Sequence, residues 1–269
     1  MTAKIHDIAA KGFQAAPEIY DRGRPEYPLD AVEHLLRELN VGPASTVVEL
    51  GVGTGKFTRL LAASVPVGAR VIAVEPVEGM RKKFSALLPS LELLAGSAEN
   101  IPLAPEAANA VIAAQAFHWF DGPIALQEIH RVLQPGGKLG LIWNARDESV
   151  DWVAKLEELT HVHEKGAPRY RTGAWRTAFE LTELFTALQV LHFRYIQVGG
   201  REMVIDRVAS SSFIAAMPAA EKNQVLDQVR ELLSTHPQTK GKDTIEFPYR
   251  TDVFWCAKRV GSNAVSRKM

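Results

Sequence analysis

The feature that most constrains this chain is an alternation of short apolar runs with segments of helical spacing between residues 46 and 143. Five apolar runs are predicted as strands, at 46–50, 69–74, 91–95, 109–114 and 138–143. Helical patterns are found at 57–65, 79–88 and 124–133. Runs that are apolar on both faces and joined through helices are typical of a parallel sheet covered on both sides. The pattern therefore predicts right-handed crossovers and a ligand crevice at the carboxyl ends of the strands.

After residue 143 the spacing changes to longer helical segments. These helical patterns cover 150–163, 175–188, 205–217 and 220–234. Two further strands are expected at 190–198 and 245–257. With them the sheet has seven strands, mostly parallel, in a doubly wound α/β arrangement. The late helices are expected to form an inserted helical cover.

The charge and cysteine content narrow the possible partners. The 31 basic and 31 acidic residues cancel, whereas a protein that grips a nucleic-acid backbone usually carries a basic surplus. No stretch approaches the roughly 18 apolar residues of a membrane-spanning helix, and the N-terminus lacks the pattern of a signal peptide. The single cysteine, Cys256, lies in an apolar run and is expected to pack there. We therefore expect a cytoplasmic protein with no nucleic-acid or membrane partner.

The first predicted strand ends in an acid, and three alternating glycines lead from it into the next helix: Glu49, Gly51, Gly53 and Gly55. Glycine tolerates a positive φ and lets a ligand approach the backbone, and a helix N-terminus offers unpaired N–H groups to an anion. A dinucleotide fingerprint would need its third glycine at position 56 or 58, where the chain has lysine and threonine. A P-loop is excluded because phenylalanine follows the lysine where serine or threonine is needed.

The E-x-G-x-G-x-G spacing resembles the nucleoside-binding signature of class I S-adenosylmethionine-dependent methyltransferases. The resemblance implies a Rossmann-like fold and S-adenosyl-L-methionine as the cofactor, with Glu49 near its methionine end. Glu75, at the end of the second strand, is suited to accept two hydrogen bonds from a ribose diol. The next residue, Pro76, is expected to line the adenine site.

The resemblance continues after the third strand. Many members of the family read G-D-A-E there, and this chain reads Gly96-Ser97-Ala98-Glu99. The family's aspartate accepts from the adenine amino group, so the resemblance gives this place to the uncharged hydroxyl of Ser97. The backbone N–H of Ala98 is expected to reach the ring. Gln115, just after the fourth strand, is predicted to hydrogen-bond the cofactor or the substrate.

Three further segments resemble a narrower branch of the family. Residues 20–28, 143–147 and 248–252 are similar to the small-molecule branch that includes trans-aconitate methyltransferase-like proteins. The resemblance implies that Tyr20 donates to the carboxylate of the cofactor and that Arg24 and Tyr27 face the substrate. Arginine would suit an acidic substrate, because a guanidinium binds a carboxylate through two parallel hydrogen bonds.

Methyl transfer from a sulfonium is an in-line displacement in which the protein aligns the acceptor and excludes water. A base is needed only where the acceptor must lose a proton, as a phenol must and a carboxylate need not. His118, just past the fourth strand, is the candidate base, since histidine titrates near neutral pH. Trp119 and Trp143 are expected to form an apolar wall of the substrate site. No metal site is expected, because the other histidines lack the usual ligand spacing.

The predicted function is therefore methyl transfer to a small molecule, at an oxygen of an acidic or phenolic metabolite. Two alternatives remain, a nicotinamide-dependent oxidoreductase and a non-catalytic module that binds the adenosyl group. The expected organisation is an N-terminal cap segment at 1–40, a cofactor-binding core at 41–145, the completion of the core with substrate-lid helices at 146–260, and a flexible tail at 261–269. The oligomeric state is left open.

Overall fold

The computed structural model describes residues 23–164, 166 and 168–260, so Tyr20 and the predicted tail lie outside the described residues. All seven predicted strands are present: β1 (Thr46–Leu50), β2 (Arg70–Glu75), β3 (Glu92–Ala95), β4 (Ala108–Ala114), β5 (Leu133–Arg146), β6 (Gln189–Gly199) and β7 (Ile245–Ala257). The helices are α3 (Leu29–Glu38), α4 (Lys56–Ser64), α5 (Glu78–Leu87), α6 (Gly122–Val132), α7 (Asp151–His161), α8 (Thr177–Glu180), α9 (Arg201–Ala209), α10 (Ser212–Ala215) and α11 (Ala219–Thr235), with the short 3-10 turns η1 (Phe117–Trp119), η2 (Tyr170–Thr172) and η3 (Ala174–Arg176). Within these ranges no helix has the length and apolar character needed to span a bilayer.

The strands form one sheet in the order β3-β2-β1-β4-β5-β7-β6. Neighbouring strands from β3 to β5 are parallel, and β7 runs antiparallel to both β5 and β6. The strand order reverses between β1 and β4, and ligands of open α/β sheets bind beyond the carboxyl ends of the strands at such a point. The predicted Rossmann-like α/β fold is confirmed.

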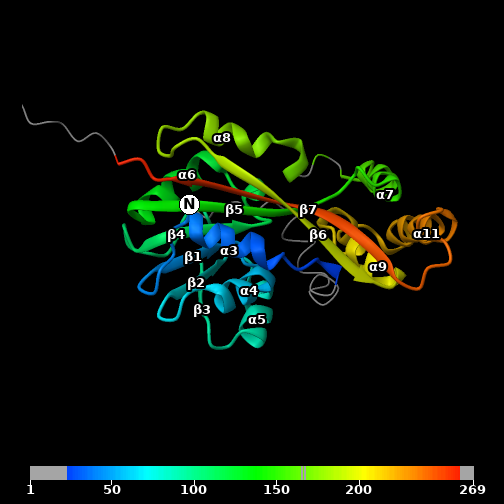
Figure 1. Cartoon of the computed structure of the whole chain (residues 1–269), viewed down its shortest axis with the longest axis horizontal. Coiled ribbons are helices and arrows are strands. Elements are labelled where there is room, and N and C mark those ends of the chain that lie inside the picture. The colour runs from blue at the N-terminus through cyan, green and yellow to red at the C-terminus, as the bar shows by residue number, and fades with distance from the viewer. Residues whose placement is uncertain (1–22, 165, 167, 261–269) are drawn as a thin grey trace, which may run out of the picture.

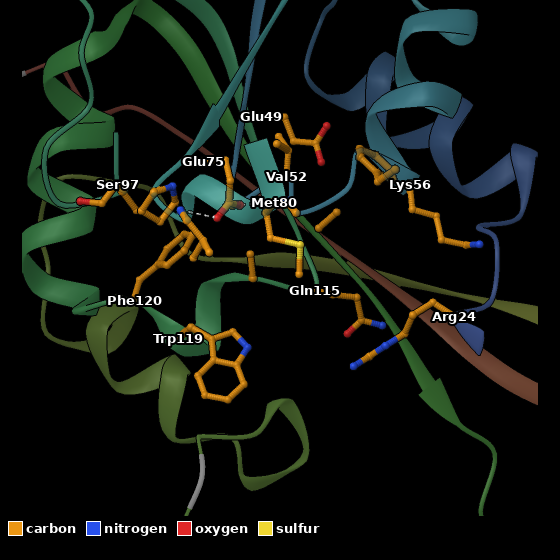
Figure 2. Close-up of a pocket in the computed structure, with 18 of the residues that line it drawn as sticks. Arg24, Glu49, Val52, Lys56, Glu75, Met80, Ser97, Gln115, Trp119 and Phe120 are labelled. Atoms are coloured by element: carbon orange, nitrogen blue, oxygen red, sulfur yellow. Dashed lines mark hydrogen bonds between the residues drawn. The ribbon is translucent and has the colours of Figure 1, made fainter. Parts of the chain in front are cut away.

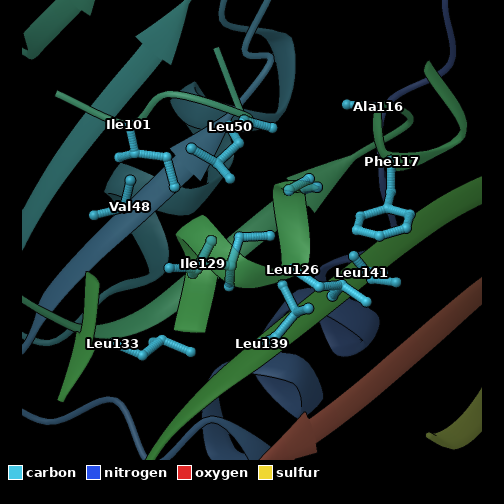
Figure 3. Close-up of a cluster of buried hydrophobic side chains, with 14 of the residues drawn as sticks. Val48, Leu50, Ile101, Ala116, Phe117, Leu126, Ile129, Leu133, Leu139 and Leu141 are labelled. Atoms are coloured by element: carbon cyan, nitrogen blue, oxygen red, sulfur yellow. The ribbon is translucent and has the colours of Figure 1, made fainter. Parts of the chain in front are cut away.

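Helices cover both faces of the sheet. Successive residues of a strand point to opposite faces, and the apolar residues on each face are buried under helices. Figure 1 shows α3, α4 and α5 on one side of the sheet and α6 and α8 on the other. Val47 of β1 accordingly shares a buried cluster with Leu35 of α3 and Leu61 of α4. Its neighbour Val48 belongs instead to the cluster that contains Leu126 of α6 (Figure 3).

The helical cover gathers at the far end of β6 and β7, where Figure 1 shows α7, α9 and α11. The first residues of β7 carry this cover: Ile245, Phe247 and Tyr249 pack with α7, α9 and α11 in a separate cluster. Later in the same strand, Val253 and Phe254 pack in the clusters on the two faces of the main sheet. One long strand therefore joins the parallel core to the helical cover.

Three predicted elements differ from the structure. The helix expected at 175–188 ends with α8, and the following segment reaches β7, where the Thr186 N–H donates to the carbonyl of Ala257 (2.9 Å). The single helix expected at 205–217 is two helices, α9 and α10. The strand expected at 138–143 is longer, because β5 begins at Leu133 and pairs with β4 through a register shift.

Gly140 of β5 sets the distance between α3 and the sheet. A Cβ at this position would lie 2.7 Å from Leu35 Cδ1 and 2.9 Å from Leu39 Cδ1. Both leucines are buried between α3 and the sheet. The absence of a side chain therefore lets the helix lie directly against the strand.

Gly140→Ala is expected to lower the free energy of unfolding by about 1–3 kcal/mol, because the added methyl must displace two packed leucines. Urea denaturation followed by circular dichroism measures this change. Gly42→Ala is the matched control, since a Cβ there would meet no heavy atom within 4 Å, and it should change stability by less than about 0.5 kcal/mol. Equal stability of the two variants would show that α3 can shift without cost.

Candidate active site

A cavity opens beyond the carboxyl ends of β1, β2 and β4, where the strand order reverses. Its volume is about 1160 Å³, including space open to solvent. Figure 2 shows side chains from the glycine turn, from the strand ends and from the cap segment around it. The predicted residues in its lining are Arg24, Tyr27, Glu49, Gly51, Gly53, Glu75, Pro76, Ser97, Ala98, Gln115 and Trp119. The fold thus brings most of the predicted site to this first cavity.

The three glycines of the turn all have a positive φ, of 70°, 57° and 88° in chain order, but their surroundings differ. A Cβ on Gly51 would lie 3.0 Å from the Cβ of Ala116. One on Gly55 would lie 2.6 Å from Leu88 Cδ1, just after α5. A Cβ on Gly53 would meet no atom within 4 Å, so its backbone is open to the first cavity. Gly55, predicted among the cofactor residues, packs against α5 and does not line the cavity.

Two buried carboxyl groups of the first cavity differ in their hydrogen bonding. Glu75 accepts from the N–H of Gly53 (2.8 Å) and from the N–H of Val77 (2.9 Å), and so fixes the glycine turn. Glu49 Oε2 is buried without a hydrogen-bond partner. Burial, with a smaller contribution from the negative charge of Glu75, raises the pKa of Glu49 to about 8. A buried carboxyl group of this kind is suited to a cationic group of a ligand.

Another part of the first cavity combines apolar side chains with one hydroxyl. In Figure 2, Ser97 and Phe120 lie on one side of Glu75, and Lys56 lies on the other. The Oγ of Ser97 is buried and has no hydrogen-bond partner. Ala98 is also buried and lines the cavity. This region is suited to a flat apolar group that carries a polar edge.

Gln115 occupies a constrained position at the end of β4. Its φ is 53°, a left-handed conformation that is uncommon for a residue other than glycine and that the surrounding structure must hold in place. The N–H of Gln115 donates to the carbonyl of Ile142 (2.9 Å), and its Nε2 donates to the carbonyl of Asn144 (2.9 Å). These bonds tie the end of β4 to β5 and hold Gln115 at the wall of the cavity.

A second cavity of about 740 Å³ adjoins the first. The two share Arg24, Gln115, Trp119 and Asn144 in their linings. Arginines from the cap segment, the end of β5, the η2 segment and α9 line the second cavity: Arg24, Arg146, Arg169, Arg171 and Arg207. The acids in this lining are Glu148 and Glu157. The second cavity therefore carries an excess of positive charge.

The arginines of the second cavity are compensated to different degrees. Arg146 pairs with Glu157 (2.9 Å), and Arg171 pairs with Glu164 (2.8 Å). Arg207 is buried on α9, and among the described residues it forms no ion pair with a carboxylate. Burial and the positive charges of neighbouring arginines lower the pKa of Arg207 to about 9. An anion that entered the cavity would therefore stabilise the buried positive charge of Arg207.

His118, the predicted base, lines the second cavity. Its Nδ1 accepts from Nε1–H of Trp143 (3.2 Å), so the neutral ring carries its proton on Nε2. Burial and the charges of Arg169 and Arg24 lower the pKa of His118 to about 3. Trp143 is fully buried and lines neither cavity, in contrast to its predicted place in the substrate wall. Trp143 instead packs beside His118 and positions its ring through this hydrogen bond.

Five polar residues that the sequence analysis did not single out line the second cavity. They are Asn144, Arg146, Arg169, Arg171 and Arg207. Three separate segments of the chain supply them, so no local spacing connected them. Asn144 and Arg146 alone had a recognisable signal, because both lie in the 143–147 segment that resembles the small-molecule branch. In the part of the chain that the structure describes, no group of three or more histidine, cysteine or acidic residues is placed to hold a metal ion.

Comparisons with known proteins agree with this arrangement. A family described as a methyltransferase domain matches residues 48–141. An uncharacterized methyltransferase of Mycobacterium tuberculosis, Rv3342, is 39% identical over 251 residues, which cover 93% of this chain and 97% of that protein. The chain belongs to the class I methyltransferases. An uncharacterized methyltransferase-like protein of Schizosaccharomyces pombe, C25B8.10, is 36% identical to this methyltransferase over 92% of this chain and 95% of that protein. The solved structure of a type II methyltransferase candidate from Anaeromyxobacter dehalogenans has the same fold, with a TM-score of 0.64 and 24% identity over 88% of this chain and 97% of that one.

Enzymes with this fold generally use S-adenosylmethionine, and the first cavity of this methyltransferase fits that molecule. The unpartnered Oε2 of Glu49 is suited to the ammonium of the methionine end. The open backbone of Gly53 permits close approach, as a side chain there would not. The unpartnered hydroxyl of Ser97 is suited to the adenine amino group. Glu49 Oε2 and Ser97 Oγ each lack a hydrogen-bond partner that such a ligand would supply.

Proposed function

We propose that this methyltransferase transfers the methyl group of S-adenosyl-L-methionine to a carboxylate oxygen of a small acidic metabolite. The observation that carries the proposal is the set of five arginines around the second cavity. A guanidinium matches a carboxylate through two parallel hydrogen bonds. The buried charge of Arg207 gives a further reason, because an anionic ligand would relieve the cost of that charge.

The state of His118 favours a carboxylate over a phenol. A ring whose pKa is about 3 is neutral near pH 7, but it is a weak base for removing a phenolic proton. An ionised carboxylate needs no base and gains from the surrounding guanidinium groups. With its proton on Nε2, His118 would donate a hydrogen bond to the acceptor, so the base role predicted for it is not needed for this acceptor.

The first cavity would hold the cofactor through residues that the sequence singled out. The cofactor supplies an activated methyl group on a sulfonium. Glu49 would bind its ammonium, and Glu75 would accept from the ribose hydroxyls while it holds the glycine turn. Trp119 and Gln115 line both cavities, so they would border the place where donor and acceptor meet. The aromatic face of Trp119 suits the positive sulfonium.

The two earlier alternatives are less well supported. Membership of the methyltransferase family argues against a nicotinamide-dependent oxidoreductase. A non-catalytic adenosyl-binding module would have no use for a second cavity with an excess of arginines in its lining. The polar second cavity therefore favours an enzyme with its own acceptor site.

Incubation with S-adenosylmethionine labelled in the methyl group tests the proposed function. The acceptors would be a panel of mono-, di- and tricarboxylates, with phenols and neutral amides of matched size beside them. Methyl esters hydrolyse in alkali and release volatile labelled methanol, whereas methyl ethers and N-methyl groups do not. We expect alkali-labile label on a carboxylate. Alkali-stable label, or labelling of the phenols alone, would contradict the carboxylate assignment.

Binding of S-adenosylhomocysteine is expected to release a proton from Glu49. With a pKa of about 8, this carboxyl group is mostly protonated at pH 7 in the free protein, and the ligand's ammonium would favour its ionised form. Affinity should therefore rise as the pH rises from 6 toward 7.5, by up to about tenfold per unit. Calorimetry in buffers of different ionisation enthalpy would measure the released proton.

Glu49→Gln is the matched control for this proton release. The amide keeps the shape of the side chain but does not titrate, so binding should be weaker and nearly independent of pH over the same range. A pH dependence that survives in this variant would assign the proton to another group.

A further inference from the structure

We propose that Tyr170 and Asp252 are positioning residues for the acceptor site. In this proposal the buried carboxylate of Asp252 holds the hydroxyl of Tyr170 and so fixes the segment that places Arg169 and Arg171 in the second cavity. The proposal rests on the proposed function, because it takes the second cavity as the acceptor site. Neither Tyr170 nor Asp252 needs to touch a substrate atom for this role.

Asp252 is a fully buried carboxylate in the middle of β7, and both of its oxygens are occupied. Oδ2 accepts from the hydroxyl of Tyr170 (2.5 Å) and from Nη2 of Arg250 (2.9 Å). Oδ1 accepts from Nε of Arg250 (2.7 Å) and lies 2.5 Å from Nδ1 of His192. The strand and the two hydrogen bonds from Arg250 fix the carboxylate, so it is a rigid anchor for Tyr170. Hydrogen bonds to a charged acceptor are stronger than those between neutral groups.

Tyr170 lines the second cavity and links this anchor to other residues around the cavity. Its ring stacks on Trp143, with centroids 4.7 Å apart and planes 23° apart. Trp143 in turn donates to His118 (3.2 Å). The carbonyl of Tyr170 accepts from the N–H of Gly173 (3.1 Å) and from Nε1 of Trp175 (3.2 Å). The hydrogen bond to Asp252 therefore holds Tyr170 in place. Tyr170 in turn positions Trp143, which contacts His118, and the turn that ends at Gly173.

The segment around Tyr170 needs such an anchor because it brings positive charges together. Arg169 and Arg171 flank Tyr170, and both pair with Glu164 (3.3 and 2.8 Å). The charges of Arg146 and Arg24 lie close enough to Arg169 to help lower its pKa. Mutual repulsion favours movement of this segment away from the cavity. A bond from Tyr170 to a fixed carboxylate outside the arginine cluster opposes that movement.

Tyr170→Phe tests the proposal, because it removes the hydroxyl and keeps the stacked ring. Hydrogen exchange read by mass spectrometry should show at least about tenfold faster exchange of the Gly173 amide, which the Tyr170 carbonyl protects. Succinate serves as the carboxylate probe, titrated into protein loaded with S-adenosylhomocysteine. Its affinity should fall by about tenfold, in line with the loss of a hydrogen bond to a charged group. The affinity for S-adenosylhomocysteine should stay unchanged.

His192→Gln is the matched control, because it alters a neighbour of Asp252 on the solvent side and leaves the Tyr170 bond in place. It should leave Gly173 exchange and succinate affinity within about twofold of the unaltered protein. Unchanged Gly173 exchange in Tyr170→Phe would overturn the proposal, and so would altered exchange with unaltered succinate affinity. If the unaltered protein itself binds no succinate or other carboxylate, the proposed function fails, and the role of Tyr170 as an acceptor-site anchor is overturned with it. Faster Gly173 exchange would then show only a structural bond.

Discussion

Gly53→Ala should weaken the binding of S-adenosylhomocysteine by about 10- to 100-fold while the protein remains folded. The physical reason is local. A Cβ on Gly53 would meet no protein atom within 4 Å, so the methyl would occupy space in the first cavity that the cofactor needs. Isothermal titration calorimetry measures the affinity, and urea denaturation shows whether the variant is folded. Its φ of 57° adds a strain that the experiment must separate from the effect on the ligand.

Gly136→Ala provides that separation. Gly136 has a φ of 78°, a Cβ there would also meet no atom within 4 Å, and it lines neither cavity. Both variants should therefore lose about 1 kcal/mol of stability from left-handed strain, and only Gly53→Ala should lose affinity. Unchanged affinity in Gly53→Ala would place the cofactor away from the glycine turn.

Arg207→Met should make the protein more stable and the enzyme much slower. In the free protein this buried guanidinium forms no ion pair within the described residues, and replacing a buried charge by an apolar side chain of similar length often stabilises by about 1–4 kcal/mol. The same change removes a partner for an anionic acceptor. The loss in kcat/KM should be at least about 30-fold, because an acceptor carboxylate would be left without its buried partner. Urea denaturation and the labelled-methyl assay measure the two effects.

Arg230→Met is the control for the loss of an arginine. Arg230 pairs with Asp227 on the exposed face of α11 (2.7 Å), and its removal should change stability by less than about 0.5 kcal/mol and leave the rate unchanged. A loss of stability in Arg207→Met would mean that the free protein already compensates this charge. An unchanged rate would remove Arg207 from the acceptor site.

The core strands were predictable because their apolar runs are short, are rich in β-branched residues and are bounded by turns. The helix predicted at 175–188 failed for a tertiary reason. Phe185 bridges to Lys258, and the Thr186 N–H donates to Ala257, so the end of this segment lies against β7 and is not free to coil. Helical spacing of apolar residues did not reveal this pairing, since its partner lies some seventy residues along the chain.

The two cavities differ in how far they could be predicted. The first is built from short motifs that follow successive parallel strands, such as the glycine turn, Glu75 and Ser97. Parallel strands place their carboxyl ends at one edge, so motifs after each strand converge without further information. The second cavity depends on how the helical cover meets the end of β5. That contact brings Arg207 of α9 near Arg146 and Arg169. No local sequence pattern predicts that these three residues meet.

By itself, the amino-acid sequence determined the strands of the sheet, the strand-to-helix glycine turn and about half of the residues that line the first cavity. These are consequences of periodicity and backbone freedom, which are local properties of a chain. Only the tertiary structure decided that His118 is partly buried and neutral, that it accepts a hydrogen bond from Trp143, and that arginines from distant segments share one cavity. Burial and the proximity of charges are properties of the packed molecule, and they set the chemistry that the same side chains can perform.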